Sequence, residues 1–344
     1  MEISFNFLIL IAAASLDYLI GDPVNWLHPV QVMGWFITGF TNLVIVTDPI
    51  ANQRLPRFSP LKMKILGIIL GMGMILGSGL VTWQIAIASS KVNPVLAIAI
   101  SSILLAACFA GRSLRAAAES VLEILETGDI PKARQELSRY VGRDTDELSE
   151  IEILRAVLET VTENAIDAVT SPLFYTLLGS ALFPYGGVAM AIAYKAASTL
   201  DSMVGYRETP YSDLGWFSAK TDDILTWLPC RLTVITLALL SRKPLYVWKI
   251  CKRDAKNDPS PNSGWSECVY AAILQVQLGG ENRYRGLVKQ KPLLGDEIEA
   301  IAAPKIQQAL TLTRTCFLIW LNLILLGAVV ATFITRELLL SPIR

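Results

Sequence analysis

Residues 65–87 read ILGIILGMGMILGSGLVTWQIAI and contain no charged side chain. A helix rises about 1.5 Å per residue, so a run of this length covers the roughly 30 Å hydrocarbon core of a bilayer. Gly67 and Gly71 are four residues apart, as are Gly73 and Gly77, and this spacing lets helix backbones approach closely in lipid. The run therefore predicts a membrane-spanning helix that packs against another helix.

Further apolar runs extend this prediction to the whole chain. Its 344 residues are 53% hydrophobic and 17% charged, whereas a soluble domain carries about a quarter charged residues. Residues 316–333 also approach bilayer length. Shorter runs, which cross only with their flanks or lie partly within the protein, occupy 5–20, 94–110, 168–183 and 186–200. We predict an all-α fold, a polytopic integral membrane helical bundle with cytoplasmic helical and loop regions.

The positions of the basic residues predict the orientation. Loop 41–64 contains four lysines and arginines and loop 88–93 only one, so the first is expected in the cytoplasm. Segment 228–240 is too short to cross and contains Arg231, which suggests a re-entrant or interfacial segment. We predict one membrane-embedded domain over 1–344, multi-pass in the inner (plasma) membrane, with its active site facing the cytoplasm. Its cytoplasmic parts are a helical region at 111–164 and a loop and helical region at 241–314.

Several functional classes are disfavoured by composition. The net charge is zero, which gives no reason to expect a nucleic-acid partner. The five cysteines lack paired spacing, as in core residues of a reduced compartment rather than disulfides or zinc ligands. A single histidine, His28, excludes multi-histidine metal sites and argues against a Ser-His-Asp triad.

The acidic stretch ETVTENAID, residues 159–167, is the strongest sign of chemistry. On a helix, Glu159, Glu163 and Asp167 recur every four residues and share a face with Arg155. Three acids at the edge of an apolar segment suit a bound cation or a proton or phosphate transfer. The structural alternative is a solvated face with an Arg155–Glu159 pair. It suits Glu159 well and Asp167 poorly, because Asp167 has apolar neighbours.

Lys195 lies inside an apolar run and needs a partner or a depressed pKa. With Thr199 and Ser202 it forms one polar helical face, and Asp201 lies farther round. A lysine beside hydroxyls and an acid suits phosphate and metal binding. A structural Lys–Asp pair explains the same residues equally well.

Other polar clusters have ordinary structural alternatives. Asp17 ends an apolar run, where a carboxylate either has a function or reaches the interface. Asp22 suits a turn or helix cap, and His28, before a proline, suits an interfacial loop. Residues 143–145, Arg-Asp-Thr, fit a phosphate site but also an ordinary helix start. For Asp222, Asp223, Arg231 and Asn262 a solvated face is the default, and at most one of the two adjacent acids would enter a site.

Nucleotide-binding motifs give little help. The chain contains neither a Gly-x-x-x-x-Gly-Lys-Ser/Thr loop nor a Gly-x-Gly-x-x-Gly fingerprint after a strand. Residues 279–284 are rich in glycine and polar groups but lack phosphate-loop spacing. Residue spacing alone thus favours a one-sided polar site for a phosphorylated or anionic substrate with a divalent cation, without naming the reaction.

A family resemblance emerges from the order of short motifs between about residues 10 and 290. The motifs are Leu16-Asp17, Gly21-Asp22-Pro23, His28-Pro29, Gly142-Arg143-Asp144-Thr145, Glu163-Asn164-x-x-Asp167, Ser171-Pro172-Leu173-Phe174, Thr199-Leu-Asp201-Ser-Met203, Gly205-Tyr-Arg207, Asp222-Asp223, Pro229-x-Arg231 and Pro261-Asn262-Ser-Gly264-Trp265. Together they resemble the CobD/CbiB family, the adenosylcobinamide-phosphate synthases of cobalamin biosynthesis. Ser198 and Ser263 depart from the family's expected Asn and Ala.

The resemblance implies an amide-forming ligase. Its substrates would be adenosylcobyric acid, a corrinoid, and aminopropanol phosphate or an ethanolamine-type analogue. ATP is the expected co-substrate and Mg²⁺ the expected metal, because a carboxylate must be activated before an amine can displace its oxygen. The expected partners are these small molecules and the lipid bilayer, and the sequence leaves a homo-oligomer open.

Residue roles follow from the motif positions. The resemblance implies a catalytic set of Asp17, Glu163, Asp167, Lys195 and Asp222, in which Asp17 and Asp222 are candidates to accept the amine proton. Mg²⁺ would be held by Glu163, Asp167 and Asp201. Substrate and phosphate would be bound by Asp22, His28, Arg143, Asp144, Thr145, Asn164, Thr199, Ser202, Arg207, Asp223, Arg231 and Asn262.

A membrane protein without catalytic activity is the competing class. It would be a transporter for an anionic solute or a sensor resembling the AmpE proteins. A transporter is expected to show inverted repeats, and the sequence shows no repeat. A sensor has no need for so many acids beside a lysine. The absence of a nucleotide-binding loop is the strongest argument against an ATP-dependent enzyme.

Overall fold

The computed structural model describes residues 2–22, 26–48 and 53–340, and most of them are helical. This confirms the predicted helical class. The chain divides into two compact units. Unit 1 comprises Met1–Ala110, Pro172–Leu225 and Ile319–Arg344, and unit 2 comprises Gly111–Ser171 and Thr226–Leu318. The predicted polar regions 111–164 and 241–314 lie entirely in unit 2.

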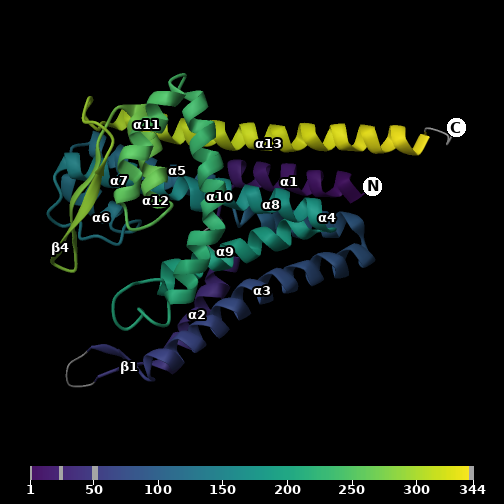
Figure 1. Cartoon of the computed structure of the whole chain (residues 1–344), viewed down its shortest axis with the longest axis horizontal. Coiled ribbons are helices and arrows are strands. Elements are labelled where there is room, and N and C mark those ends of the chain that lie inside the picture. The colour runs from purple at the N-terminus through teal and green to yellow at the C-terminus, as the bar shows by residue number, and fades with distance from the viewer. Residues whose placement is uncertain (1, 23–25, 49–52, 341–344) are drawn as a thin grey trace. The chain divides into compact units, whose positions relative to one another are not determined.

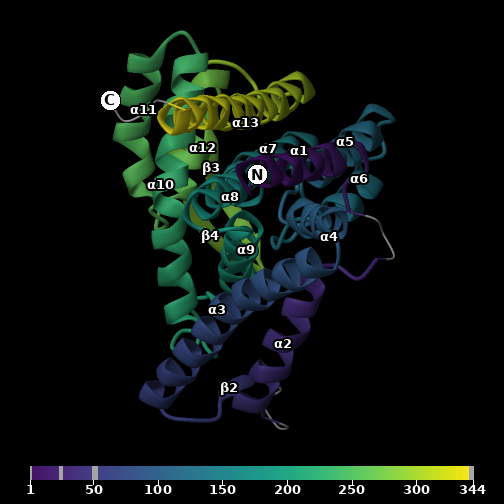
Figure 2. The ribbon, with the colours of Figure 1, turned by 90° about the vertical axis from the view of Figure 1, so that its right-hand side faces the viewer.

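Unit 1 is built mainly from apolar helices. They are α1 (Glu2–Leu19), α2 (Pro29–Val44), α3 (Pro60–Val92), α4 (Pro94–Ala106), α8 (Ser171–Leu182) and α9 (Gly186–Val204), together with the start of α10 (Trp216–Leu240) and the end of α13 (Ala303–Leu340). Helix α3 packs along α9 and α4, as Figure 1 shows, and α1 packs on α4. Figure 2 shows α3 beside α2 and α9 from a second direction. Two short antiparallel strands, β1 (Ile45–Thr47) and β2 (Arg54–Pro56), follow α2.

Local capping explains where these helices begin. The ring of His28 accepts a hydrogen bond from the Val30 backbone N–H at 3.2 Å, and Gln31 accepts one from the His28 N–H at 3.3 Å. These reciprocal bonds form a capping box. Asn93 separates α3 from α4, and its side chain accepts from the Val95 N–H at 2.7 Å. In both helices proline occupies the first turn, where its missing N–H costs nothing.

The two glycine pairs of α3 have different surroundings. A methyl group added at Gly67 would overlap the Leu214 carbonyl, and one at Gly71 would overlap the Phe217 ring. Nothing lies within 4 Å of a methyl group at Gly73 or Gly77. The first pair therefore permits close packing, but against the turn at Leu214 and the Phe217 side chain, not against the backbone of another helix as its spacing predicted. In the described part of unit 1, the second pair makes no such contact.

Among the residues that the structure describes, four helical stretches are long and apolar enough to cross a membrane. They are Pro60–Val92, Pro94–Glu126, Glu150–Leu182 and Trp216–Leu240. The premise that 228–240 is too short to cross, which led to its interpretation as re-entrant or interfacial, is wrong. These residues form the end of α10 (Trp216–Leu240), a 25-residue helix that starts before the apolar run and continues through Pro229. The chain is therefore a membrane protein by helix length and composition.

Unit 2 combines helices with a β-hairpin. Its elements are α5 (Gly111–Glu126), α6 (Ile130–Leu137), α7 (Glu150–Ala165), η1 (Ile166–Thr170), the end of α10, α11 (Pro244–Asp254), η2 (Ala255–Asn257), α12 (Ser263–Leu274), β3 (Leu278–Tyr284), β4 (Leu287–Leu294) and the start of α13 (Ala303–Leu340). Strands β3 and β4 are antiparallel. Helix α12 packs on α7, α11 and both strands (Figure 1). The hairpin lies in region 241–314, for which the sequence predicted only loops and helices.

Candidate functional site

Glu159 is the centre of a buried charge network in unit 2. The Arg143 guanidinium donates to Glu159 Oε2, and the Gly279 backbone N–H in β3 donates to Oε1 at 3.0 Å. The side chains of Glu159 and Arg143 are only 1% and 7% exposed. A buried ion pair is tolerated when both partners are also hydrogen-bonded. The structural alternative of a solvated Arg155–Glu159 pair is therefore wrong.

Arg155 binds the hairpin instead. Its guanidinium donates to the Gly279 carbonyl and, at 2.8 Å, to the Glu281 carbonyl. Asn282 joins the two arginines, because its side-chain oxygen accepts from Arg143 at 2.8 Å and from Arg155 at 3.4 Å. Two cations and one acid thus fasten β3 to α7. Arg143, predicted to bind phosphate, has fold contacts for both terminal nitrogens.

Asp144 and Thr145 also have contacts within unit 2. The Asp144 carboxylate accepts from the backbone N–H groups of Arg285 and Gly286 at 2.9 and 2.7 Å. Gly286 has a φ of +77°, which glycine adopts easily in a tight turn. Asp144 therefore closes the turn between β3 and β4, and Thr145 beside it is buried. Their roles in substrate binding stay predictions.

Glu163, one turn after Glu159, has a different environment. It is exposed, and its carboxylate has no hydrogen-bond or ion-pair partner among the residues that the structure describes. The Asn164 amide donates to the Thr160 carbonyl at 2.9 Å. Asp167 is partly buried in η1, a single π-helical turn. Such turns are frequent at functional sites. They also interrupt the four-residue spacing that placed Asp167 on one stripe with Glu159.

Glu267 and Lys291 were missed by the sequence analysis. Lys291 Nζ on β4 donates to Glu267 Oε1 on α12 at 3.0 Å, and Glu267 is fully buried. Burial raises the pKa of Glu267 to about 8; Lys291 opposes this shift, and Glu163 and Glu159 add to it. These four side chains therefore share one electrostatic neighbourhood. In the sequence, the only sign of a buried acid was that Glu267 is the single charged residue in the apolar stretch 266–274. No sequence pattern indicated that Lys291 would pair with it.

Arg231 and Asn262, both predicted to bind substrate, lie together in unit 2. Arg231 donates to the Pro261 carbonyl at 2.8 Å and to the Asn262 side-chain oxygen at 3.4 Å. Its guanidinium also lies over the rings of Trp227 and Trp265, 5.3 and 4.7 Å from their centroids. Aromatic rings can stabilise a cation where water is scarce. This arrangement explains how helix α10 accommodates an arginine.

Lys195 belongs to unit 1, whereas the residues described so far belong to unit 2. It is partly buried in α9, and within the described residues its ammonium has no hydrogen-bond or ion-pair partner. The structural alternative of a Lys195–Asp201 pair is therefore wrong. The Thr199 hydroxyl donates to the Lys195 carbonyl at 2.7 Å, and the Ser202 hydroxyl donates to the Ser198 carbonyl at 2.9 Å. Both hydroxyl oxygens can still accept a hydrogen bond.

The remaining predicted residues of unit 1 have partners. His28 Nε2 lies 3.3 Å from Asp22, and Asp223 lies 3.8 Å from Lys220. Pro23 of the same motif lies outside the described residues. Polar or electrostatic contacts are also made by Asp17, Asp201, Arg207 and Asp222. The catalytic and binding roles of these residues stay predictions.

The predicted Mg²⁺ site was compared with the arrangement of acids. Among the described residues, no group of three or more His, Cys, Asp or Glu side chains is placed to hold a metal ion. Glu163 and Asp167 belong to unit 2 and Asp201 to unit 1. Mg²⁺ commonly binds through one or two carboxylates together with substrate phosphates. The exposed Glu163 fits that mode, whereas an all-protein cage does not follow from this arrangement.

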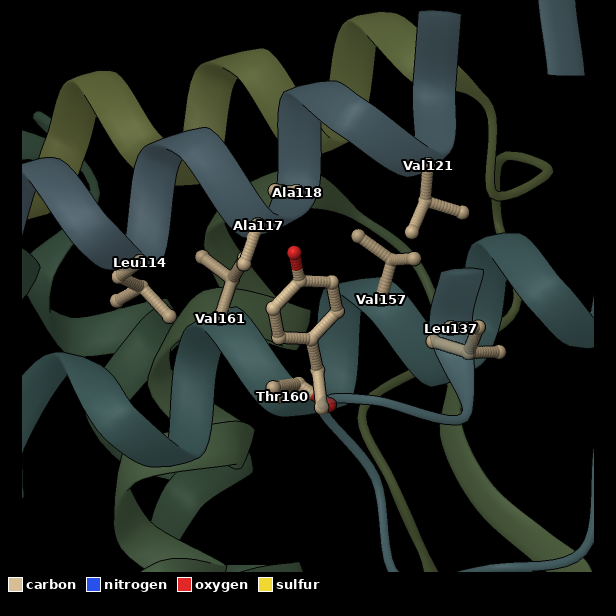
Figure 3. A pocket seen from close by; sticks show the side chains of 9 residues that line it. Leu114, Ala117, Ala118, Val121, Leu137, Val157, Thr160 and Val161 are labelled. Carbon is tan, nitrogen blue, oxygen red and sulfur yellow. The ribbon is translucent and has the colours of Figure 1, made fainter. Parts of the chain in front are cut away.

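An apolar pocket lies elsewhere in unit 2. It is bounded by α5, α6 and α7, and Figure 3 shows Leu114, Val121, Leu137 and Val157 around it. Tyr140 and Thr160 add two hydroxyl groups to its lining, but no charged side chain that could hold a phosphate or a metal lines it. The candidate site is therefore the polar neighbourhood of Glu163, Glu267 and Lys291, not this pocket.

Comparison with known proteins identifies the family. The CobD/Cbib protein family model matches residues 10–313. The chain belongs to the CobD/CbiB family. A cobalamin biosynthesis protein CobD of Synechocystis sp. is 54% identical over 325 residues, 94% of this chain and 92% of the relative. A CobD of Halalkalibacterium halodurans is 38% identical over 332 residues, 94% of this chain and 98% of the relative.

The CbiB branch gives a similar result. A cobalamin biosynthesis protein CbiB of Salmonella typhi is 35% identical over 309 residues, which cover 89% of this chain and 90% of the relative. No solved structure matches significantly. The resemblance inferred from the ordered motifs is thus confirmed at the level of a CobD/CbiB cobalamin biosynthesis family. The matched region, residues 10–313, contains Glu163, Glu267 and Lys291.

Proposed function

We propose that this CobD/CbiB protein is a membrane-bound ligase that joins adenosylcobyric acid to aminopropanol phosphate, or an ethanolamine-type analogue, through an amide bond. Family membership supports a role in cobalamin biosynthesis. The observation that favours a reaction is the exposed carboxylate of Glu163, which has no partner among the described residues. Beside it, Glu159 is already neutralised by Arg143.

The proposed reaction needs an activated carboxyl group, because a carboxylate oxygen is a poor leaving group. ATP transfers a phosphoryl group to the propionate of adenosylcobyric acid and leaves as ADP. The amine then attacks the carbonyl carbon, a C–N bond forms, and the C–O bond to phosphate breaks. Phosphate leaves with the electron pair, and the amine proton passes to a base.

The chain's own residues would divide these tasks. Glu163, with Asp167, would hold Mg²⁺ together with the substrate phosphates. When bound, the metal would neutralise phosphate charge. Lys195 would bind phosphate through an ammonium that has no partner in the described residues. Asp17 and Asp222 are the proposed acceptors of the amine proton, and Asp201 remains a further candidate metal ligand.

The proposed setting is the inner membrane, with the site open to the cytoplasm. The four apolar helical stretches found among the described residues support a location in a membrane. The orientation rests on the basic loop 41–64. Both phosphorylated reactants are charged and cross hydrocarbon poorly, so a cytoplasmic site would receive them directly.

The proposal is tested with purified protein in nanodiscs, supplied with adenosylcobyric acid, aminopropanol phosphate, ATP and Mg²⁺. We expect amide product by mass spectrometry and ATP consumption that requires both other substrates. Omission of each reactant in turn provides the controls. Tight corrinoid binding without amide or ATP consumption would contradict the proposal and favour a transporter or a sensor.

A further inference from the structure

Glu267 and Lys291 form a pair to which the proposed reaction assigns no role. Lys291 Nζ donates to Glu267 Oε1 at 3.0 Å. The other carboxyl oxygen, Oε2, is buried and has no hydrogen-bond partner among the described residues. Buried polar atoms in native proteins are almost always hydrogen-bonded, so an exception calls for an unseen proton acceptor, water or ligand.

The charges around the pair indicate the state of the acid. Glu159 and Glu163 face it from α7, and Lys291 faces it from β4. Burial raises the pKa of Glu267 to about 8, Lys291 opposes the shift, and the two α7 acids reinforce it. Burial and the two α7 acids thus favour the protonated form of Glu267, whereas the Lys291 ammonium favours its carboxylate.

Two other cations of this part of unit 2 already have partners. Arg143 neutralises Glu159, and Arg143 and Arg155 both donate to Asn282. Arg155 also interacts electrostatically with Glu152.

The Lys291 ammonium has hydrogen-bond donors that a ligand could use. An ammonium has three N–H donors. One is directed to Glu267, and the others have no hydrogen-bond partner in the described part of the chain. The Lys291 side chain is 25% exposed, whereas that of Glu267 is 0% exposed. A ligand from solvent can therefore reach the lysine but not the acid.

We propose that Lys291 binds a phosphate oxygen of a substrate and that Glu267 is a positioning residue that holds the Lys291 ammonium. The inference rests on the proposed function, which supplies two phosphorylated reactants, ATP and aminopropanol phosphate. Both present the same phosphate chemistry. Lys291 lies in the electrostatic neighbourhood of Glu163, so the bound phosphate would lie near the carboxylate proposed to hold Mg²⁺.

The first test compares Lys291→Met with Lys289→Met. Lys289 is an exposed lysine two residues away on the same strand. Binding of ATP and of aminopropanol phosphate is measured separately by calorimetry on protein in nanodiscs. We expect Lys291→Met to weaken one of the two by about tenfold or more, and Lys289→Met to change neither. The compound that loses affinity identifies the phosphate. Unchanged binding of both in Lys291→Met overturns the proposal.

The second test examines Glu267. Glu267→Gln keeps an oxygen that accepts from Lys291, whereas Glu267→Leu removes it. The account expects near wild-type phosphate affinity in Glu267→Gln and a loss in Glu267→Leu that matches Lys291→Met. If Glu267→Leu, shown to be folded by thermal unfolding, keeps wild-type phosphate affinity, Lys291 does not need Glu267 and the positioning role is wrong.

Amide formation separates this inference from the proposed function. Phosphate binding that depends on Lys291, in a wild-type protein that makes no amide, supports the inference and contradicts the ligase. Amide formation with an unchanged KM for both phosphorylated substrates in Lys291→Met supports the ligase and overturns the inference.

Discussion

Arg143 and Glu159, sixteen residues apart in the chain, form a buried ion pair that fastens the β3–β4 hairpin to helix α7. The second carboxylate oxygen of Glu159 accepts from the Gly279 N–H, so the acid contacts both a cation and the backbone of the hairpin. One acid of the stretch 159–167 thus maintains the fold, and its neighbour Glu163 remains exposed.

Breaking this pair should destabilise unit 2. Arg143→Met leaves the Glu159 charge buried without its cation, which typically costs about 3–5 kcal/mol. The double variant Arg143→Met/Glu159→Gln should recover part of the loss, because no uncompensated charge remains. Thermal unfolding in detergent measures both. Arg139→Met is the matched control, since its side chain is 65% exposed and pairs with Glu136 at the surface. Equal unfolding temperatures for all three variants would contradict the assignment.

Asp144 should act mainly through the hairpin turn. Asp144→Ala removes two acceptors for backbone N–H groups and is expected to cost about 1–3 kcal/mol. Hydrogen exchange at Arg285 and Gly286 should accelerate more than exchange in α7. Asp146→Ala, an exposed acid two residues away, provides the control. Unchanged exchange at the turn, with weaker phosphate binding, would instead favour the predicted substrate contact.

The glycines of α3 offer a matched pair of substitutions. Gly67→Ala places a methyl group against the Leu214 carbonyl, so we expect a loss of about 1–3 kcal/mol from overpacking. Gly77→Ala meets open space and should be neutral or slightly stabilising, since alanine favours helix. Thermal unfolding in nanodiscs distinguishes them. A larger loss at Gly77 than at Gly67 would mean that α3 packs through its other glycine pair.

Stability should decline with pH because of Glu267. An unfolded glutamate titrates near about 4.3, whereas burial raises the folded pKa of Glu267 to about 8. Between these values the folded state holds a proton that the unfolded state has released, so the free energy of unfolding falls as pH rises. Glu267→Gln removes this contribution.

Unfolding temperatures between about pH 5 and 8 test this linkage. The difference between Glu267→Gln and wild type should grow across the range and level off above it. Glu281→Gln, at an exposed glutamate on β3, should follow wild type. A constant difference between Glu267→Gln and wild type would show that Glu267 is ionised in the folded protein.

The sequence predicted the parts of the fold that depend on long apolar runs. Residues 65–87 lie inside α3, and the pair of runs around 184–187 forms helices α8 and α9. It did not predict that α10 begins at Trp216. Polar residues at 216–227 hid the helix, and Arg231 is accommodated by two tryptophans whose positions depend on tertiary packing.

The candidate site was less predictable because partners lie far apart in the chain. The acids at 159, 163 and 167 look alike in sequence, yet Glu159 is buried by a hairpin more than a hundred residues away. Lys291 ends the polar run Lys289-Gln290-Lys291 on β4, which suggests a solvent-facing side chain, and only the packing of α12 places Glu267 beside it. Helical periodicity predicts which residues share one face of a helix. It does not predict which residues from other elements contact that face, because tertiary packing determines them.

The most direct measurement of the central claim is amide formation by Glu163→Gln beside wild type and Glu150→Gln, an exposed glutamate at the start of the same helix. Purified proteins in nanodiscs receive adenosylcobyric acid, aminopropanol phosphate, ATP and Mg²⁺, and the product is followed by mass. The account predicts amide from wild type and Glu150→Gln, and a loss of about a hundredfold or more in folded Glu163→Gln, because a proposed Mg²⁺ ligand is removed. Undiminished amide formation by Glu163→Gln would contradict it.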